Sequence, residues 1–302
     1  MGNKHFAGKA YVFGLMVFAA VIFVSDFKHS ENQIEKARHN ENLLSSKNLV
    51  LREKNDNLSE KLDKLKEELE SFREGTEAYK NRHQKLYEEA DYLVHLDVEG
   101  INIKSKRAFQ SSLSGMIFDF NGKQYILTAG HIQDAGEIVN KITVYFKYDE
   151  SFVQEARLIG IDEKCDVAVL RFSDPFFHFP GRLARFGNSS DIQIGEETIS
   201  LGSPLGFAYT FSAGYLGNKV DDEKNGRTMF IHWATINPGN SGGPLLNNRG
   251  EVIGMNVIVL YQFLNNAVTP MAAAVTINDV KVAIVWIFLK DFAKRLMFHR
   301  KM

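Results

Sequence analysis

The stretch NPGNSGGPLLN, residues 237–247, surrounds one serine, Ser241, with glycine, proline and asparagine. Glycine allows tight, left-handed turns and leaves backbone N–H groups uncovered, so the main chain here can approach a reacting atom closely. The same composition is also typical of an ordinary surface turn. By itself the stretch therefore fits either the seat of a nucleophile or a turn, and the rest of the chain has to decide.

Two other stretches place a histidine and an aspartate at the edges of predicted strands. LTAGHI (residues 127–132) contains His131, and EKCDVAVLRF (residues 163–172) contains Asp166. A histidine can act as a general base when a carboxylate fixes its tautomer and stabilises its charge. Either residue alone is more typical of a structural histidine or of a turn aspartate. Asp166 follows His131 by 35 positions, and Ser241 follows Asp166 by 75.

The motifs TAGH, DVAVL and GNSGGPLLN occur in this order, and FGNSSDIQIGEETISLGSPLGFAYTFSAGYLG lies between the last two. Over residues 105–280 this arrangement resembles the trypsin-like serine proteases, and among them the HtrA/Deg family. The resemblance implies an all-β, chymotrypsin-like fold of two barrels, with a catalytic triad in the cleft between them. It also implies a serine endopeptidase that hydrolyses peptide bonds of proteins, in protein quality control or regulated processing.

The resemblance implies a role for each residue of the three motifs. Ser241 Oγ attacks the scissile carbonyl group, His131 accepts the hydroxyl proton, and Asp166 holds the imidazole. The backbone N–H groups of Gly239 and Ser241 form the oxyanion hole that binds the developing negative charge.

The candidate substrate pocket consists of two residues that precede the serine in sequence. Thr235 stands six positions before Ser241, where trypsin-like pockets have their floor, and Ile236 follows it. Neither carries a carboxylate, so we expect cleavage after an uncharged, small or medium-sized aliphatic residue. The stretch IVLYQFLNNAVTP, residues 258–270, has no clear counterpart in the family, and we expect it to reshape this pocket.

The sequence departs from the HtrA pattern at its C-terminal end. Members of that family carry one or two PDZ domains after the protease, whereas the residues between 280 and Met302 are too few for such a domain. We therefore expect regulation to come through the N-terminal segment or the loops of the protease.

Residues 1–27 are predicted to be a membrane anchor. Residues 10–25, AYVFGLMVFAAVIFVS, are uncharged and apolar, and Lys4 and Lys9 precede them. No small-residue cleavage site closes the run, so an uncleaved anchor is favoured over a cleaved signal peptide, although the run is short for a spanning helix. The lysines predict a single-pass topology with a cytoplasmic N-terminus and a protease domain that is periplasmic or otherwise extracytoplasmic.

Residues 28–95 are predicted to form a coiled coil, because apolar residues recur at alternating steps of three and four in a charged, proline-free segment. The apolar seam consists of Ile34, Ala37, Leu44, Leu51, Leu58, Leu62, Leu65, Leu69, Phe72, Tyr79, Leu86, Ala90 and Leu93, interrupted by Glu41, Asn48, Asn55, Thr76 and His83. A single amphipathic helix folded back on the globular part is the alternative. We expect parallel self-association: the family resemblance favours a trimer and the seam asparagines favour a dimer, with the trimer preferred.

Residues 96–280 are the predicted trypsin-like domain. MIFDFNGKQYILT, residues 116–128, consists of two apolar runs joined by Asn121-Gly122, which is a strong hairpin signal. Further short runs, bounded by turn residues, predict an all-β double barrel. Residues 281–302 return to a helical period with a basic end, and they are predicted to form an amphipathic helix that caps a barrel or touches a membrane surface.

Composition narrows the classes of function and partner. A formal charge of -1 and a pI near 6.8 argue against nucleic acid as a partner. The single cysteine, Cys165, excludes an intrachain disulfide framework, and no His/Cys/Asp set has ligand spacing, so neither a metal nor a cofactor is expected. The expected partners are protein or peptide substrates, the membrane and further copies of the chain. Two alternatives to an active protease stay open: a catalytically silent, protease-like binding module and a coiled-coil scaffold.

Overall fold

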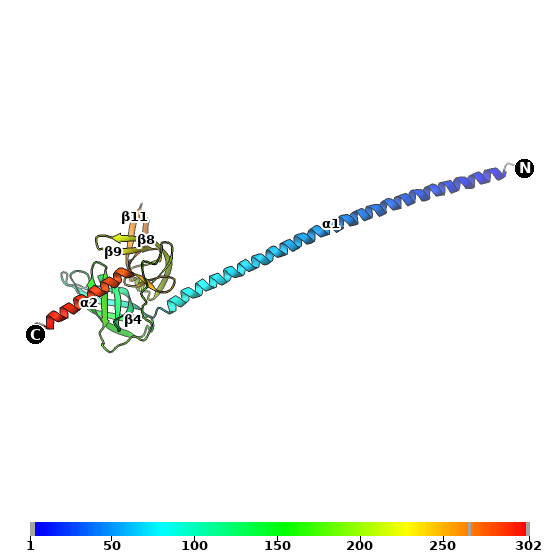
Figure 1. The fold of residues 1–302 in the computed structure, drawn as a ribbon. Helices are drawn as coiled ribbons and strands as arrows, with labels where there is room; N and C mark the ends of the chain where they lie inside the picture. The colour runs from blue at the N-terminus through cyan, green and yellow to red at the C-terminus, as the bar shows by residue number, and fades with distance from the viewer. Residues whose placement is uncertain (1–3, 265–266, 300–302) are drawn as a thin grey trace. The chain divides into compact units, whose positions relative to one another are not determined.

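The structure, a computed structural model, contains two compact units, Met1–Tyr79 (unit 1) and Lys80–Met302 (unit 2) (Figure 1). It describes the backbone of residues 4–264 and 267–299 and the side chains of residues 14–257 and 272–297. Helix accounts for unit 1, whereas unit 2 contains twelve strands and a second helix in its described part.

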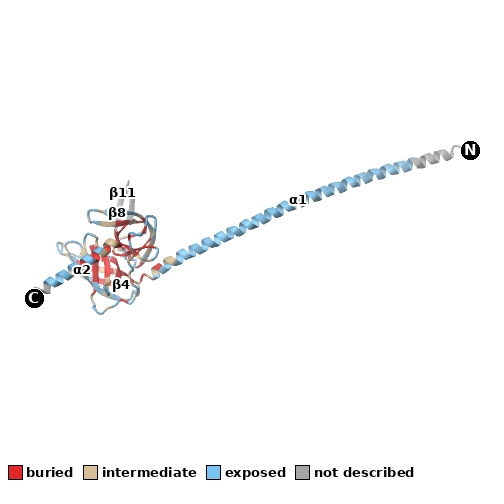
Figure 2. Ribbon diagram, in the orientation of Figure 1, coloured by how far each residue is buried: buried red, intermediate tan, exposed pale blue. Residues whose placement is uncertain are grey.

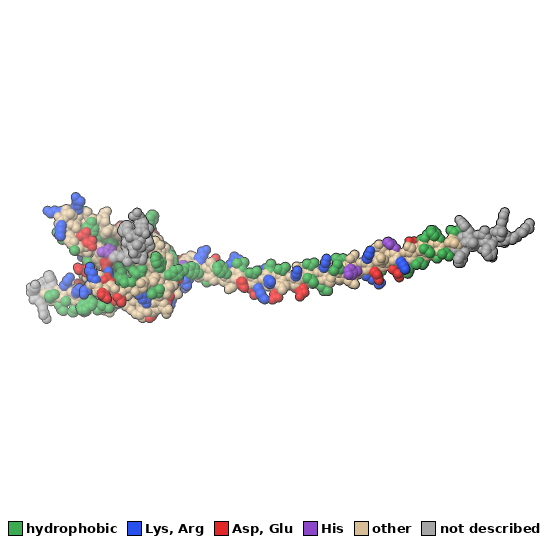
Figure 3. Space-filling view, turned by 90° about the horizontal axis from the view of Figure 1, so that it is seen from above, with side chains coloured by type: hydrophobic (Ala, Val, Ile, Leu, Met, Phe, Trp, Pro, Cys, Tyr) green, Lys and Arg blue, Asp and Glu red, His purple; other side chains and the backbone are tan. Residues whose placement is uncertain are grey.

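Unit 1 lies within one long helix, α1 (Lys4–Glu88), which continues into the first residues of unit 2. The described seam side chains of unit 1 face solvent: Leu58 is 62% exposed and Phe72 is 74% exposed (Figure 2). Figure 3 shows hydrophobic side chains alternating with charged ones along this helix. Because no second helix packs against the described part of unit 1, the coiled coil stays a prediction about several copies of the chain.

The predicted membrane anchor of residues 1–27 is wrong. Within the residues that the structure describes, no helix contains a stretch long and apolar enough to cross a membrane. The physical reason is length, because a spanning helix needs about 20 apolar residues and the run at residues 10–25 is shorter. The predicted localisation was inferred from that anchor and is wrong with it. It comprised a single-pass topology, a cytoplasmic N-terminus and an extracytoplasmic protease domain. Residues 1–3 lie outside the described part.

The predicted all-β double barrel is confirmed, since the strands of unit 2 close into two six-stranded antiparallel barrels. The first has the order β1-β2-β3-β6-β5-β4, with β1 (Leu93–Asn102), β2 (Ala108–Phe120), β3 (Lys123–Ala129), β4 (Glu137–Phe146), β5 (Val153–Asp162) and β6 (Val167–Phe172). The second has the order β10-β11-β12-β9-β8-β7, with β7 (Glu197–Gly202), β8 (Thr210–Asp222), β9 (Arg227–His232), β10 (Pro244–Leu246), β11 (Val252–Leu264) and β12 (Ala267–Thr276).

The hairpin predicted at Asn121-Gly122 joins β2 to β3, with Phe120 opposite Lys123. Both turn residues have positive φ, 54° for the asparagine and 75° for the glycine, which is the geometry that favours these two residue types. The largest hydrophobic cluster extends from the first barrel into the second, where Leu201 is fully buried. The two barrels therefore pack against each other through buried hydrophobic side chains.

The last turns of α1 belong to unit 2 and correct the predicted coil boundary at residue 95. Arg82 and His83 both form ion pairs with Glu197 at the start of β7, the histidine Nε2 at 2.9 Å. Leu86 and Ala90 are 9% and 1% exposed and belong to the barrel core. They have seam spacing, yet they pack against strands of their own chain. Leu93, also assigned to the seam, is the first residue of β1.

Helix α2 (Ile277–His299) closes the chain and begins four residues before the predicted start at 281. Its buried face packs mainly on β5, β6 and β11 and consists of Ile277, Val280, Ala283, Ile284 and Ile287. Asp279 in the first turn accepts a hydrogen bond from the Thr228 N–H at 2.7 Å. This contact ties the start of the helix to β9 of the second barrel.

Candidate active site

His131 and Asp166 lie side by side at the ends of two paired strands. His131 is in the 3-10 turn Gly130–Ile132 after β3, and Asp166 directly precedes β6, which pairs with β3. The Nδ1 atom of His131 lies 2.8 Å from Asp166 Oδ2, and the His131 backbone N–H donates to Asp166 Oδ1 at 2.7 Å. Both carboxylate oxygens therefore hold one residue and leave Nε2 of the imidazole for another partner.

Gly130 makes this close approach possible. Its N–H donates to the Asp166 carbonyl oxygen at 2.8 Å, and a Cβ at this position would stand 2.9 Å from the carbonyl carbon of the same aspartate. Asp166 itself has a φ of 54°, in the left-handed region that aspartate tolerates better than most residues. The segments AGH (residues 129–131) and CDV (residues 165–167) therefore contact each other through backbone and side-chain hydrogen bonds.

Asp166 raises the pKa of His131 above its ordinary value through their hydrogen bond, while burial of the ring acts in the opposite direction. The carboxylate stabilises the imidazolium and, when the ring is neutral, keeps the proton on Nδ1 and the acceptor lone pair on Nε2. The His131 side chain is 39% exposed and the Asp166 side chain 19%, so solvent still reaches the histidine. The pair has the geometry of an oriented general base.

Ser241 lies in the loop of residues 237–243, between β9 and β10. Its side chain is partly buried, and Oγ donates a long hydrogen bond of 3.4 Å to the carbonyl oxygen of Val257. Hydroxyl donors ordinarily bond at 2.7–2.8 Å, so this contact holds the hydroxyl weakly. The serine is thus available to a better acceptor after a rotation about its Cα–Cβ bond.

Gly242 brings the serine loop against the strand that carries the histidine. It has a φ of 86°, and a Cβ there would overlap the carbonyl oxygen of Ser114 and Oγ1 of Thr128. Thr128 lies three residues before His131 on the same chain segment. A side chain at 242 would push the two barrels apart at this point, which explains why a glycine follows the serine.

Ser114 of β2 is a supporting residue that the sequence motifs did not reveal. It is completely buried, and its Oγ donates to the carbonyl oxygen of Gly239 at 2.7 Å while accepting from the Ser203 N–H at 2.8 Å. Its backbone N–H donates to the Ser241 carbonyl oxygen at 2.9 Å, and its own carbonyl accepts from Thr128 Oγ1 at 2.7 Å. One serine of the first barrel therefore fixes both ends of the segment 239–241.

The predicted oxyanion-hole groups have no competing acceptor. Among the described residues, neither the Gly239 N–H nor the Ser241 N–H makes a hydrogen bond. The preceding carbonyl oxygen, that of Pro238, accepts from the Leu205 N–H at 2.8 Å, and Gly239 has a φ of 103°. A Cβ at 239 would overlap the Ser203 carbonyl oxygen, so only glycine fits this conformation.

The two predicted pocket residues have different environments. Thr235 is exposed, and its backbone N–H donates to Ser212 Oγ at 2.8 Å. Ile236 is 6% exposed, so its side chain contributes to packing more than to an open pocket. The segment 258–270, which was expected to reshape the pocket, lies outside the residues whose side chains are described.

A buried polar network behind the serine loop was also missed from the sequence. His232 Nε2 lies 3.1 Å from Asn256 Oδ1, and Asn256 Nδ2 donates to Ser200 Oγ at 2.9 Å. The Asn256 carbonyl oxygen accepts from the Gly242 N–H at 2.7 Å. Burial lowers the pKa of His232 to about 4, so this imidazole is neutral near pH 7 and serves the network as a hydrogen-bonding group. The sequence signal that could have indicated this network was a polar residue within an otherwise apolar predicted strand.

Comparison with known proteins places this geometry in a family. Residues 113–255 match the model of the trypsin-like peptidase domain. Residues 113–255 carry a trypsin-like peptidase domain. The matched segment includes the histidine, the aspartate and the serine described above, in the order His131, Asp166, Ser241.

The curated relatives of this trypsin-like chain are proteins of the HtrA/DegP type. One is the serine protease Do-like HtrA of Bacillus subtilis, 36% identical over 179 residues, or 56% of this chain and 37% of the relative. Another is the probable periplasmic serine endoprotease DegP-like of Hahella chejuensis, 38% identical over 149 residues, or 49% of this chain and 29% of the relative. The chain thus spans about a third of the length of the curated relatives it matches.

A solved structure of the HtrA-type protease AlgW with a tripeptide has the same fold as this trypsin-like chain. The two superimpose with a TM-score of 0.55 and 23% sequence identity, over 68% of this chain and 63% of that one. At this identity the similarity concerns the fold, and it agrees with the two barrels of unit 2.

Proposed function

We propose that the chain is a serine endopeptidase that hydrolyses peptide bonds of protein substrates, with His131, Asp166 and Ser241 as its catalytic triad. The observation that carries the proposal is the two-point contact of the Asp166 carboxylate with the side chain and the backbone of His131. The HtrA/DegP-type relatives support the same activity. Protein quality control or regulated processing is the corresponding biological role.

In the proposed reaction Ser241 Oγ attacks the carbonyl carbon of the scissile bond as its proton passes to His131 Nε2. The tetrahedral intermediate carries a negative charge on the former carbonyl oxygen. His131 then gives its proton to the leaving nitrogen, the C–N bond breaks, and the acyl group stays on the serine. A water molecule repeats the sequence: His131 takes its proton, the hydroxyl adds to the acyl carbon, and the returned proton restores the Ser241 hydroxyl.

The free N–H groups of Gly239 and Ser241 are the proposed donors to the oxyanion. Donors fixed in advance stabilise the transition state without reorganisation, and one such donor is worth about 10² to 10³ in rate. The positive φ of Gly239 and the bond from Ser114 to its carbonyl oxygen support this orientation.

For substrate selection we propose cleavage after an uncharged aliphatic residue. Thr235, the exposed member of the predicted pair, offers a hydroxyl and no charge to a substrate side chain. A proteome-derived peptide library treated with the enzyme gives the test, and a majority of cuts after lysine or arginine would refute this part of the proposal.

We further propose that unit 1 assembles the protease by parallel self-association of α1. The exposed seam side chains of this helix, such as Leu62 at 53% and Leu69 at 61%, support the proposal because large apolar residues in such a stripe are stabilised by a partner helix. The trimer is again preferred to the dimer.

Labelling of the full chain with an active-site-directed fluorophosphonate tests the catalytic proposal, with Ser241→Ala as the matched control. We expect one label per chain in the parent and none in the variant. A catalytically silent binding module is the alternative favoured by the hydrogen bond from Ser241 Oγ to Val257, because the hydroxyl donates to that carbonyl oxygen and, among the described residues, makes no hydrogen bond to His131. An unlabelled, folded parent would establish the alternative.

A further inference from the structure

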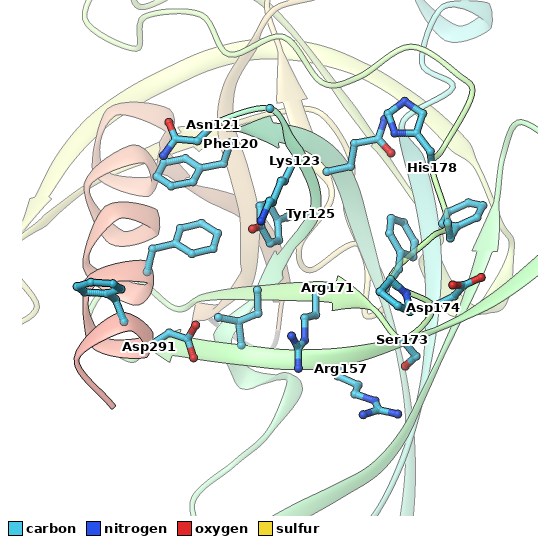
Figure 4. A pocket seen from close by; sticks show the side chains of 18 of the residues that line it. Phe120, Asn121, Lys123, Tyr125, Arg157, Arg171, Ser173, Asp174, His178 and Asp291 are labelled. Carbon is cyan, nitrogen blue, oxygen red and sulfur yellow. The ribbon is translucent and has the colours of Figure 1, made fainter. Parts of the chain in front are cut away.

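A large groove lies on the outside of the first barrel, between α2 and the strands (Figure 4). Its volume is about 890 Å³, within the range of ligand-binding clefts. The walls come from the β2–β3 hairpin, from β5 and β6, from the segment 173–178 and from the outer half of α2. None of the proposed catalytic residues lines it.

Two arginines stand next to each other in this groove. Arg157 of β5 and Arg171 of β6 are directly opposite in the antiparallel register, and both are exposed (Figure 4). In the part of the chain that the structure describes, neither guanidinium forms an ion pair or a side-chain hydrogen bond. Like charges directly opposite on paired strands are destabilising, so this pair lowers stability unless an anion lies between them.

The other charges of the groove do not neutralise the pair. Arg295 of α2 is bound to Asp291 at 2.8 Å, so that arginine and that aspartate balance each other. Lys123 on the hairpin adds one positive charge and Asp174 one negative charge. The groove therefore keeps a net positive charge, concentrated at Arg157 and Arg171.

An aromatic surface lies beside the arginines. Phe120 of the hairpin and Phe288 of α2 stack with ring centroids 4.4 Å apart, and Tyr125 meets Phe288 edge-on at 4.8 Å. Phe292, one turn further along α2, also lines the groove and is 61% exposed. A ligand that satisfies both parts has to carry an anionic group and an apolar group close together.

We propose that this groove binds an extended acidic segment of another polypeptide, in which a carboxylate side chain lies on Arg157 and Arg171 and a neighbouring apolar side chain lies on the aromatic surface. Arginine matches a carboxylate with two parallel hydrogen bonds, and two guanidiniums side by side provide this geometry twice. A small inorganic anion would satisfy the charge, yet it would leave the aromatic surface and most of the volume unfilled.

The groove and the catalytic residues occupy opposite ends of the same two strands. β3 begins at Lys123 in the groove and ends just before His131, whereas β6 begins just after Asp166 and carries Arg171 near its far end. The strands are six or seven residues long, so the two sites are about 20 Å apart along them. A polypeptide held in the groove is therefore bound at a second site, outside the proposed catalytic machinery.

Fluorescence anisotropy with a labelled synthetic peptide that alternates glutamate and leucine tests the proposal. The protein is the full chain with Ser241→Ala, so that the peptide stays intact and binding is measured apart from proteolysis. We expect saturable binding, and Arg157→Gln/Arg171→Gln should raise Kd at least about tenfold, because hydrogen bonds to charged groups are lost. Arg157→Lys/Arg171→Lys should fall between the two, and Phe292→Ala should weaken binding of the leucine-containing peptide.

The matched control is Lys104→Gln/Lys224→Gln, which removes two exposed positive charges from residues outside the groove. This variant should bind like the parent. Equal weakening in the control, or equal binding of a twin peptide with glutamine in place of glutamate, would overturn the proposal. So would protection of the two arginines from phenylglyoxal by inorganic phosphate but by no peptide, because the site would then belong to a small anion.

Discussion

The seam of α1 in unit 1 and the serine loop of unit 2 are held in their conformations by different kinds of contact. The seam residues repeat every three or four positions and lie on the surface of their helix, with Phe72 74% exposed. The loop of residues 237–243 has no repeat, and its conformation depends on bonds such as the one from Ser114 to Gly239, 125 positions apart in sequence. A local repeat is enough to specify a helix, whereas the conformation of the serine loop requires residues that are close only after folding.

The largest effect should follow from replacing Ser241 in this loop or His131 in the turn after β3. We expect Ser241→Ala and His131→Ala each to lower kcat/KM for a peptide substrate by at least ~10⁴, because residues of a triad act as one unit. Steady-state kinetics on the purified full chain measure the loss. Thermal unfolding should give an unchanged Tm for Ser241→Ala, and retained casein cleavage by this variant would refute the catalytic assignment.

Asp166→Asn should lower kcat by about 10³ to 10⁴, because it removes the charge and the fixed tautomer of the imidazole.

Since Asp166 raises the pKa of His131, activity of the parent should rise with pH through that raised pKa, as the base loses its proton. The residual activity of the variant should rise at a lower pH than that of the parent, because the imidazole loses the contact that raises its pKa. The pair stabilises the fold at pH below the unfolded pKa, and this contribution disappears as pH rises through the folded pKa. The measurement is kcat against pH for the parent and the variant. An unchanged midpoint in Asp166→Asn would show that the contact between Asp166 and His131 does not raise the pKa of the histidine.

Ser114→Ala should have a smaller effect, on the contacts that shape the loop. The buried Ser203 N–H loses its acceptor and the Gly239 carbonyl loses its donor, which should cost about 1–3 kcal/mol in the free energy of unfolding. We expect kcat to fall about 10- to 100-fold with a smaller change in KM, since the proposed oxyanion donors are displaced.

Ser112→Ala is the matched control for that experiment. It lies two positions away on the same strand, and its hydroxyl is exposed and bonds to Asp97. This variant should resemble the parent in both kcat and unfolding free energy. Equal losses in the two variants would indicate a general effect on β2.

The smallest effect on catalysis should come from the helix. Leu62→Lys/Leu69→Lys should reduce the mass measured by analytical ultracentrifugation while kcat on a short peptide stays within about twofold, because charges at seam positions disrupt helix pairing. Asn57→Lys/Ser71→Lys adds the same charges outside the seam and should keep the parent mass. A monomeric parent, or an unchanged mass for the seam variant, would show that α1 does not assemble the chain.

The sequence predicted best where the signal was local or belonged to a complete motif. The hairpin at Asn121-Gly122 and the double barrel are confirmed, because turn chemistry and strand alternation are short-range properties. Leu86 and Ala90 were assigned to the coil because periodicity detects an apolar stripe but cannot identify what covers it. The anchor was wrong because the apolar run at residues 10–25 is shorter than a spanning helix requires, and the lack of a cleavage site does not supply the missing length.

The supporting residues around the serine loop could not be predicted in the same way. Ser114 is one serine among several in β2, and only its tertiary bonds to residues 203, 239 and 241 distinguish it from Ser112. The paired arginines of the groove were equally hidden, since their register depends on how β5 and β6 align. Both cases involve long-range pairing, which a single sequence does not encode in any short pattern.

The junction between α1 and the first barrel has a consequence for the order of events during synthesis. Arg82 and His83 leave the ribosome more than a hundred residues ahead of Glu197, and Leu86 precedes all the described strands of the core to which it belongs. Until β7 has been made, the contacts of this segment with Glu197 cannot form. Long-range closure of this kind slows folding and exposes apolar surface on the nascent chain. The last turns of α1 are thus synthesised early and can dock only after β7 has been made.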